Sequence, residues 1–198
     1  MSLREITKDL HTDAERTAFA KILLSGEISK EQYAQYLYQM LLIYGPIEMG
    51  NEVQGFFKDL PDIQRTWAIY QDFIELAGKD YTGYKWLPST VDYHNYILEL
   101  LGDPNRRHLI KAHLYCRHMG DLYGGQILAK RVPGSGKFYQ FKDADKLKEQ
   151  IRAELTDDLG DEARVAFEWA IKIMRELNNE PSMGHPDSNP ETAGREFQ

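Results

Sequence analysis

The chain carries the stretch HLYCRHMGDLYGGQIL at residues 113–128, where three glycines and an aspartate interrupt a segment with the spacing of one long helix. Each glycine inside a helix costs roughly 1 kcal/mol relative to alanine, so some feature of the protein must require the exposed backbone. Gly120 and Gly124 lie four residues apart and would share a face, forming a bare strip against which a flat molecule could lie. Spacing alone leaves two simpler interpretations open: close packing of another helix, or a helix that ends at Gly124 and Gly125.

A second informative segment lies near the N-terminus, where LHTDAE at residues 10–15 contains His11 and Glu15 four residues apart. On a helix the two side chains would share one face, and the carboxylate could orient the imidazole through the ring nitrogen that does not bind a metal. Taken alone, a histidine on an amphipathic helix is more often a polar or core residue than a metal ligand. The pair becomes informative only together with the glycine segment.

Both segments resemble motifs of the haem oxygenase family. GDLYGGQIL is similar to the GDLSGGQ signature of its distal helix, with Tyr-x-Arg-x-x-Gly-Asp preceding it, and the His/Glu pair resembles its proximal-helix motif. The resemblance extends over residues 3–177 and is weakest over 50–81. Tyr123 stands where the family commonly has serine and His118 where it often has tyrosine, so Tyr123 could crowd the distal side or point away. We do not interpret His118 as a ligand, since a strong sixth ligand would block oxygen binding.

The resemblance implies an all-α single domain over residues 1–180 that holds haem between the two helices, followed by a mobile tail at 181–198. It implies that His11 ligates the iron with support from Glu15, that Gly120 and Gly124 leave room above the ring, and that Asp121 organises the waters that deliver protons. Further haem-binding candidates, chiefly for the two propionates, are Arg4, Lys8, Tyr115, Arg117, Lys148 and Arg152.

The implied activity is oxidative cleavage of haem to biliverdin, carbon monoxide and ferrous iron, with haem as both cofactor and substrate. Two alternatives use the same fold. One is a haem carrier without catalysis, and the other is a haem-free relative of the helical thiaminase type, which would need neither His11 nor the glycine strip.

Composition is compatible with this interpretation. The 198 residues, 42% hydrophobic and 28% charged, suffice for one domain with a substantial core. A lone cysteine, Cys116, cannot form an internal disulfide and favours a reducing cytoplasm; we expect a small buried hydrophobe there rather than a thiolate ligand. We expect neither an export leader nor a membrane anchor. The net charge of −7 argues against nonspecific nucleic-acid binding.

Charge is unevenly distributed along the chain. Residues 104–152 contain eleven Lys/Arg against four Asp/Glu, whereas residues 153–198 contain four against eleven. The basic stretch could be an ordinary solvated surface, or it could bind an acidic electron donor of the ferredoxin type. No GxGxxG motif follows a predicted strand, so the reducing power must come from a partner. A downstream bilin reductase is a further possible partner. The cations predicted to form a docking face are Arg106, Arg107, Lys111, Lys130, Arg131, Lys137 and Lys142.

Helical periodicity dominates the chain. Caps and breaks predict a first helix over residues 2–24 and a long helix that begins after an N-cap at Ser29 and could be kinked at Pro46. Further helices are predicted over 61–76 and from 89 or 90 to 101. The glycine segment forms the next helix, and the last two cover 144–159 and 161–177.

Overall fold

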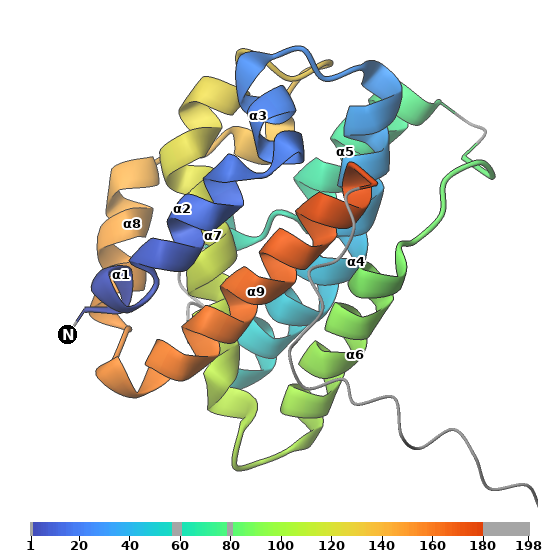
Figure 1. Cartoon of the computed structure of the whole chain (residues 1–198). Coiled ribbons are helices and arrows are strands. Elements are labelled where there is room, and N and C mark those ends of the chain that lie inside the picture. Colours follow the sequence, from blue (N-terminus) through green and yellow to red (C-terminus); the bar gives the residue numbers. More distant parts are fainter. Residues whose placement is uncertain (1, 57–60, 79–80, 180–198) are drawn as a thin grey trace, which may run out of the picture.

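The computed structural model describes residues 2–56, 61–78 and 81–179, and every regular element within these ranges is a helix (Figure 1). This confirms the predicted all-α class. The α-helices are α1 (Leu3–Ile6), α2 (Lys8–Arg16), α3 (Ala18–Ser25), α4 (Lys30–Gln54), α5 (Thr66–Ala77), α6 (Pro88–Gly102), α7 (Ile110–Leu128), α8 (Ala144–Ala153) and α9 (Gly160–Leu177). Short 3-10 turns lie at Pro61–Ile63, Arg107–Leu109, Lys137–Tyr139 and Asp157–Leu159. The predicted tail, residues 181–198, lies outside the described residues.

Helix α4 is the central helix of the domain. Its N-terminus has the predicted N-cap at Ser29, and the structure adds a capping box, in which the Ser29 side chain accepts from the backbone of Gln32 and the Gln32 side chain accepts from that of Ser29. Apolar residues on several sides, including Tyr33, Leu37 and Ile43, are fully buried. A helix that is apolar all round belongs in the interior, and α4 accordingly packs against α5, α6 and α7.

The prediction of one helix over residues 2–24 is wrong, because the segment is divided at Thr7 and Thr17 into three helices. Thr17 adopts an extended backbone (φ −58°, ψ 147°), and its hydroxyl accepts a hydrogen bond from the Ala20 amide at 3.2 Å. Threonine competes in this way for backbone groups and caps the following helix. The break gives α2 and α3 independent directions, and both pack on α9.

Helix α7 continues through all three glycines. The alternative that the helix ends at Gly124 and Gly125 is therefore wrong, and the glycines must be explained by what surrounds the helix. Two other boundaries differ from prediction: α5 begins only after a 3-10 turn at Pro61–Ile63, and α8 ends at Ala153 before a separate turn.

A buried polar network fixes α7 between α6 and α9. His113 of α7 has its Nδ1 at 2.8 Å from the Tyr93 hydroxyl and its Nε2 at 2.8 Å from Glu162 Oε1. Burial lowers the pKa of His113, so the neutral ring donates from Nε2 to the carboxylate and accepts from the tyrosine at Nδ1. Within the described residues, no helix is long and apolar enough to cross a lipid bilayer.

Candidate functional site

The bare strip on α7 faces open space. A Cβ added at Gly120 would meet no atom within 4 Å, and one added at Gly124 would only reach Leu128 Cδ1 at 4.0 Å. Gly125 differs, because a Cβ there would lie 3.0 Å from the ring of Tyr139. Generic helix packing therefore explains Gly125 but explains neither Gly120 nor Gly124.

The His11 helix packs on α9, close to the part of α7 that precedes this strip. Leu10 of α2 packs on a small cluster of Cys116 from α7 with Ala166 and Phe167 from α9. Cys116 and Gly120 are four residues apart on one face of α7, so the cluster on which Leu10 packs lies one turn before the bare strip. Figure 1 shows α2 crossing in front of α7, with α8 beside them.

His11 itself is accessible. Its side chain is 56% exposed, its Nδ1 lies 3.6 Å from Glu15 Oε1, and its ring contacts that of Phe167 at a centroid distance of 5.9 Å. The predicted i, i+4 pairing with Glu15 is therefore present. An exposed imidazole, oriented at one nitrogen and free of buried partners, can ligate a metal through the other.

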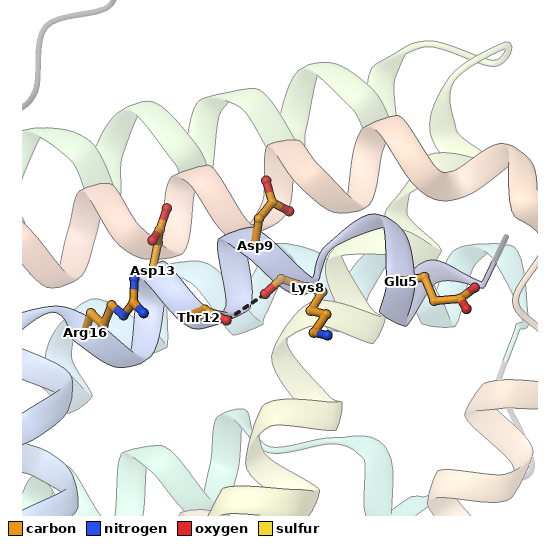
Figure 2. A pocket seen from close by; sticks show the side chains of 6 residues that line it. All are labelled: Glu5, Lys8, Asp9, Thr12, Asp13 and Arg16. Carbon is orange, nitrogen blue, oxygen red and sulfur yellow. Dashed lines mark hydrogen bonds between the residues drawn. The ribbon is translucent and has the colours of Figure 1, made fainter.

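A shallow hollow runs along the outer side of α1 and α2, where Figure 2 shows acidic and basic side chains together. Lys8 lines this hollow with Asp9, and neither His11 nor the glycine strip contributes to it. A bidentate contact of Asp9 with Arg164, at 2.8 and 2.9 Å, anchors α2 to α9 and holds the pKa of Asp9 near 2. Every residue that lines this hollow is charged or polar, which does not match a large apolar ring.

Asp121 is buried on α7, one helical position from the strip, and accepts a hydrogen bond from the hydroxyl of Tyr44 on α4. Burial raises the pKa of Asp121 to about 7, although the Tyr44 hydrogen bond and the charges of Arg117 and Arg65 act against the rise. Asp121 also lines a hollow that includes Lys130 of the surface. A carboxyl with this pKa and this access can exchange a proton at neutral pH.

Arg117 is placed differently from the sequence-based expectation. It is buried, with its guanidinium 5.2 Å above the centre of the Tyr93 ring, and its Nε and Nη2 have no hydrogen-bond partner among the described residues. It therefore lies in the interior, one helical turn before Asp121 on α7. Cys116 is also buried, which raises the pKa of its thiol to about 12, so it is a protonated apolar residue as expected.

His118 is occupied by backbone contacts. Its Nδ1 lies 3.1 Å from the Leu114 carbonyl and its Nε2 lies 2.6 Å from the Ile63 carbonyl. Burial lowers the pKa of His118 to about 4, against these two contacts, so the ring is neutral. The expectation that His118 is not a ligand agrees with this geometry.

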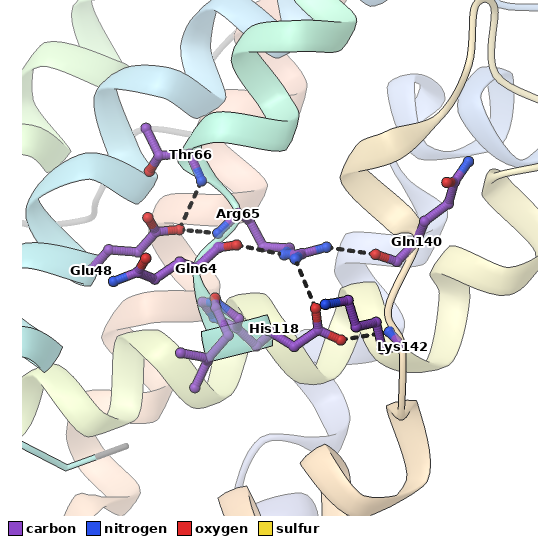
Figure 3. A network of polar contacts seen from close by, with 9 residues as sticks. Glu48, Gln64, Arg65, Thr66, His118, Gln140 and Lys142 are labelled. Carbon is purple, nitrogen blue, oxygen red and sulfur yellow. Dashed lines mark hydrogen bonds and ion pairs between the residues drawn. The ribbon is translucent and has the colours of Figure 1, made fainter. Parts of the chain in front are cut away.

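Figure 3 shows how the same region is fastened to neighbouring segments. Glu48 accepts from the backbone amides of Arg65 and Thr66 at 2.5 and 2.9 Å, and Arg65 donates to the Gln140 carbonyl at 2.7 Å. These contacts hold the start of α5 against α4 and the segment before α8. The charge of Arg65 also lowers the pKa of Asp121, so these contacts lie near that carboxyl.

Cations gather on the other side of the strip. Lys148 and Arg152 of α8 lie over the ring of Tyr123, with Nζ and Cζ at 4.8 and 5.6 Å from its centre. The charges of Arg4 and Arg152 act on the half-buried phenol of Tyr115, so these three predicted residues lie near one another. Lys8 is not part of this group.

Comparison with known proteins agrees with these features. The family model described as heme oxygenase matches residues 1–176. The chain belongs to the haem oxygenase family. It is 30% identical to the heme oxygenase of Pyropia yezoensis, over 89% of this chain and 84% of that protein. It is 29% identical to heme oxygenase 2 of Macaca fascicularis over 89% of this chain, but spans only 64% of that protein's length.

A solved structure agrees with the fold. Heme oxygenase-1 from Synechocystis sp. PCC 6803, whose structure is of its complex with heme, aligns with a TM-score of 0.77 and 26% identity over 89% of this chain and 90% of that one. Family membership and fold together identify this chain as an enzyme of the haem-cleaving type.

The donor set fits a haem better than a bare metal ion. Among the described residues, no group of three or more His, Cys, Asp or Glu side chains could hold a metal. A porphyrin supplies its own equatorial nitrogens, so one accessible imidazole is sufficient as the protein ligand. The accessible His11 imidazole is a candidate for this single ligand.

The seven cations of the predicted docking face fall into two groups in the structure. Helix α7 has 19 residues and is about 28 Å long, so it separates the seven cations into two groups. Arg106, Arg107 and Lys111 lie at its N-terminal end, where Lys111 pairs with Glu154 at 3.1 Å. The other four follow its C-terminal end, nearer to the glycine strip: Lys130, Arg131, Lys137 and Lys142.

Sequence reasoning missed two residues of the site. Tyr44 lies 77 residues from its partner Asp121, and only its place in an aromatic stripe of α4 marked it, as a core residue. The contact of Tyr123 with two cations was also unforeseen. In both cases the partner belongs to another helix, so no local spacing could reveal it.

Proposed function

We propose that this protein is a haem oxygenase that binds haem between α2 and α7 and cleaves it to biliverdin, carbon monoxide and ferrous iron. The observation that carries the proposal is the open face of Gly120 and Gly124, one turn beyond the cluster on which Leu10 of the His11 helix packs. Two glycines destabilise a helix, and no packing neighbour requires them here, so we infer that this surface is free to receive a ligand.

Haem, when bound, supplies the iron at which O2 is activated and is itself the molecule that is cleaved. His11 would ligate the iron from the α2 side, and Glu15 would orient its ring. On the opposite side, the bare backbone at Gly120 and Gly124 would admit a small molecule between the helix and the ring plane. No side chain there would compete for this space.

Asp121 would deliver protons to that space. Its pKa near 7 lets it gain and lose a proton at neutral pH, and the Tyr44 hydroxyl holds one of its oxygens in a fixed direction. Since the carboxyl is one helical position from the strip, we propose that it acts through ordered water and does not ligate the iron. Glu48 and Arg65 fasten the start of α5 to α4 and to the segment before α8, near this carboxyl.

The propionates of haem would bind the cations of α8. Lys148 and Arg152 lie at the edge of the strip, with Tyr115 and Arg4 close to Arg152. Charge-assisted contacts with two carboxylates would fix the rotation of the ring in its own plane. Arg117 and Lys8 carry weaker support, because Arg117 is buried and Lys8 lines the charged hollow of α2.

We further propose that electrons come from an acidic carrier of the ferredoxin type, which docks on the basic group after α7. Lys130 and Arg131 follow Gly124 by six and seven residues, so this group is the nearer of the two to the strip. At physiological salt the screening length is about 8 Å, so local cations can attract a carrier despite the net charge of −7. A reducing cytoplasm is the compartment we propose.

The test is a turnover experiment with the purified protein. Haemin is added, the visible spectrum is recorded, and a reduced ferredoxin is then supplied under air. We expect one haem per chain and the appearance of a bilin band with loss of the haem band. A stable haem complex that yields no bilin with any reductant would indicate the carrier alternative, and no haem binding at all would contradict the proposal.

A further inference from the structure

One aromatic side chain contacts both predicted propionate-binding cations. The ring of Tyr123 lies 4.8 Å from Lys148 Nζ and 5.6 Å from Arg152 Cζ, although Tyr123 and the cations come from different helices. Tyr123 remains 54% exposed, while the Lys148 side chain is only 12% exposed. The ammonium group is therefore held close to the protein surface.

The tyrosine ring is the contact that the two cations share. Lys148 and Arg152 are four residues apart on α8 and repel each other. Lys148 also pairs with Asp145 at 3.0 Å, but that carboxylate is 94% exposed and contributes little. Arg152 has no carboxylate within ion-pair distance among the described residues. The negative face of an aromatic ring attracts both cations.

The position of Tyr123 connects the cations to the glycine strip. It directly precedes Gly124 and follows Gly120 by three residues, so its ring marks the edge of the bare face. A flat ligand on the strip would meet Tyr123 at its rim, and its carboxylates would meet Lys148 and Arg152 there. Because the ring already holds these flexible side chains, less conformational entropy is lost when an anion binds.

We propose that Tyr123 is a positioning residue, which holds Lys148 and Arg152 at the rim of the strip so that they receive the two carboxylates of haem. The inference rests on the proposed function. The bulky Tyr123 side chain inside the glycine motif is an unusual feature of this chain. Through its contact with the two cations, it would determine how tightly haem binds and in which rotation. Tyr123 acts through the cations and has no part in the chemistry.

The test compares Tyr123→Leu with Tyr123→Phe, which keeps the aromatic face and removes only the hydroxyl. In the protein without porphyrin, NMR of the Lys148 side chain should show an upfield ring-current shift that persists in Tyr123→Phe and disappears in Tyr123→Leu. Since Tyr123 is exposed, both variants should fold, and thermal denaturation checks this.

Binding is measured with zinc protoporphyrin IX and with its dimethyl ester, which lacks the two charges. We expect Tyr123→Leu to weaken binding of the free acid about fivefold and to leave the ester unchanged, with Tyr123→Phe close to wild type. In a Lys148→Ala/Arg152→Ala background, Tyr123→Leu should have no further effect.

Two results would overturn the inference. One is an equal loss of binding affinity for the free acid and for the dimethyl ester, which would mean that Tyr123 only packs against the porphyrin. The other is an unchanged binding affinity for both ligands, together with an unshifted Lys148 resonance in wild type. Failure of wild type to bind any metalloporphyrin would instead refute the proposed function, and this inference with it.

Discussion

The hydroxyl of Tyr44 on α4 donates a hydrogen bond to the buried carboxylate of Asp121 on α7. The contact joins the central helix of the domain to the glycine helix. It opposes the effect of burial on the pKa of Asp121, which nevertheless stands at about 7. Asp121 is therefore poised between its two protonation states under physiological conditions.

Replacing Asp121 with asparagine should keep haem binding and abolish most bilin formation. The amide has similar size but cannot accept and release a proton, and loss of a general acid or base typically costs about 100-fold or more in rate. Single-turnover spectra with a chemical reductant measure the bilin yield. A wild-type yield from Asp121→Asn would mean that the carboxylate has only a structural role.

Tyr44→Phe should move the pH dependence of bilin formation. The lost hydrogen bond favours the ionised carboxylate, so its removal raises the pKa of Asp121 further and shifts the corresponding midpoint to higher pH. The rate is followed from pH 5.5 to 9 in both proteins. An unchanged midpoint would mean that the Tyr44 hydrogen bond does not affect the pKa of Asp121.

Asp121 should also make stability depend on pH. Its folded-state pKa is raised from 3.8 to about 7, so the folded protein retains a proton that the unfolded chain has lost. Stability is therefore greatest below the unfolded pKa and falls as pH rises through 7. Relative to Asp121→Asn, wild type should lose up to about 4 kcal/mol of unfolding free energy between pH 4 and pH 8. Urea titrations at both pH values test this, and a pH-independent difference between the two proteins would argue against a raised pKa.

The three glycines of α7 should respond differently to alanine. Gly120→Ala and Gly124→Ala meet open space and should stabilise the protein without haem by about 1 kcal/mol each, because alanine favours the helix. Both should reduce bilin yield, since the methyl group enters the strip. Gly125→Ala is the control: its Cβ would crowd Tyr139 and should destabilise the fold by about 1–3 kcal/mol. Full activity in Gly120→Ala would mean that haem cleavage does not require the bare strip.

Electron transfer should depend on charge at one end of α7 only. Lys130→Glu/Lys137→Glu should slow ferredoxin-driven turnover, mainly through the association rate, and the wild-type rate should fall as salt rises. The matched pair Arg106→Glu/Arg107→Glu, at the far end of α7, should have little effect, and turnover with a small neutral reductant should be unchanged in both. Equal effects of the two pairs would place the docking site elsewhere.

Much of the fold was predictable because local signals decide it. The predicted N-cap at Ser29 fixed the start of α4, and the helices predicted from 89 or 90 to 101 and over 161–177 match α6 and α9 to within two residues. The N-terminal segment failed because the same apolar spacing runs through Thr7 and Thr17, and only the backbone shows that these residues break the helix.

The candidate site divides in the same way. The pair His11 and Glu15 and the strip of Gly120 and Gly124 follow from spacing within one helix. The burial of Arg117 and the partner of Asp121 depend on how separate helices pack, which spacing along one helix does not determine.

The central claim is that His11 is the protein ligand of a haem bound against the glycine strip. Its side chain is 56% exposed, so His11→Ala should fold normally, and the exposed His108 provides a matched control. The decisive measurement is the visible and resonance Raman spectrum of the haem complex of His11→Ala, before and after addition of free imidazole. The account predicts loss of the histidine-ligated spectrum and of bilin formation in His11→Ala, recovery of both with imidazole, and no change in His108→Ala. An unaltered iron-ligation spectrum in His11→Ala without imidazole would contradict it.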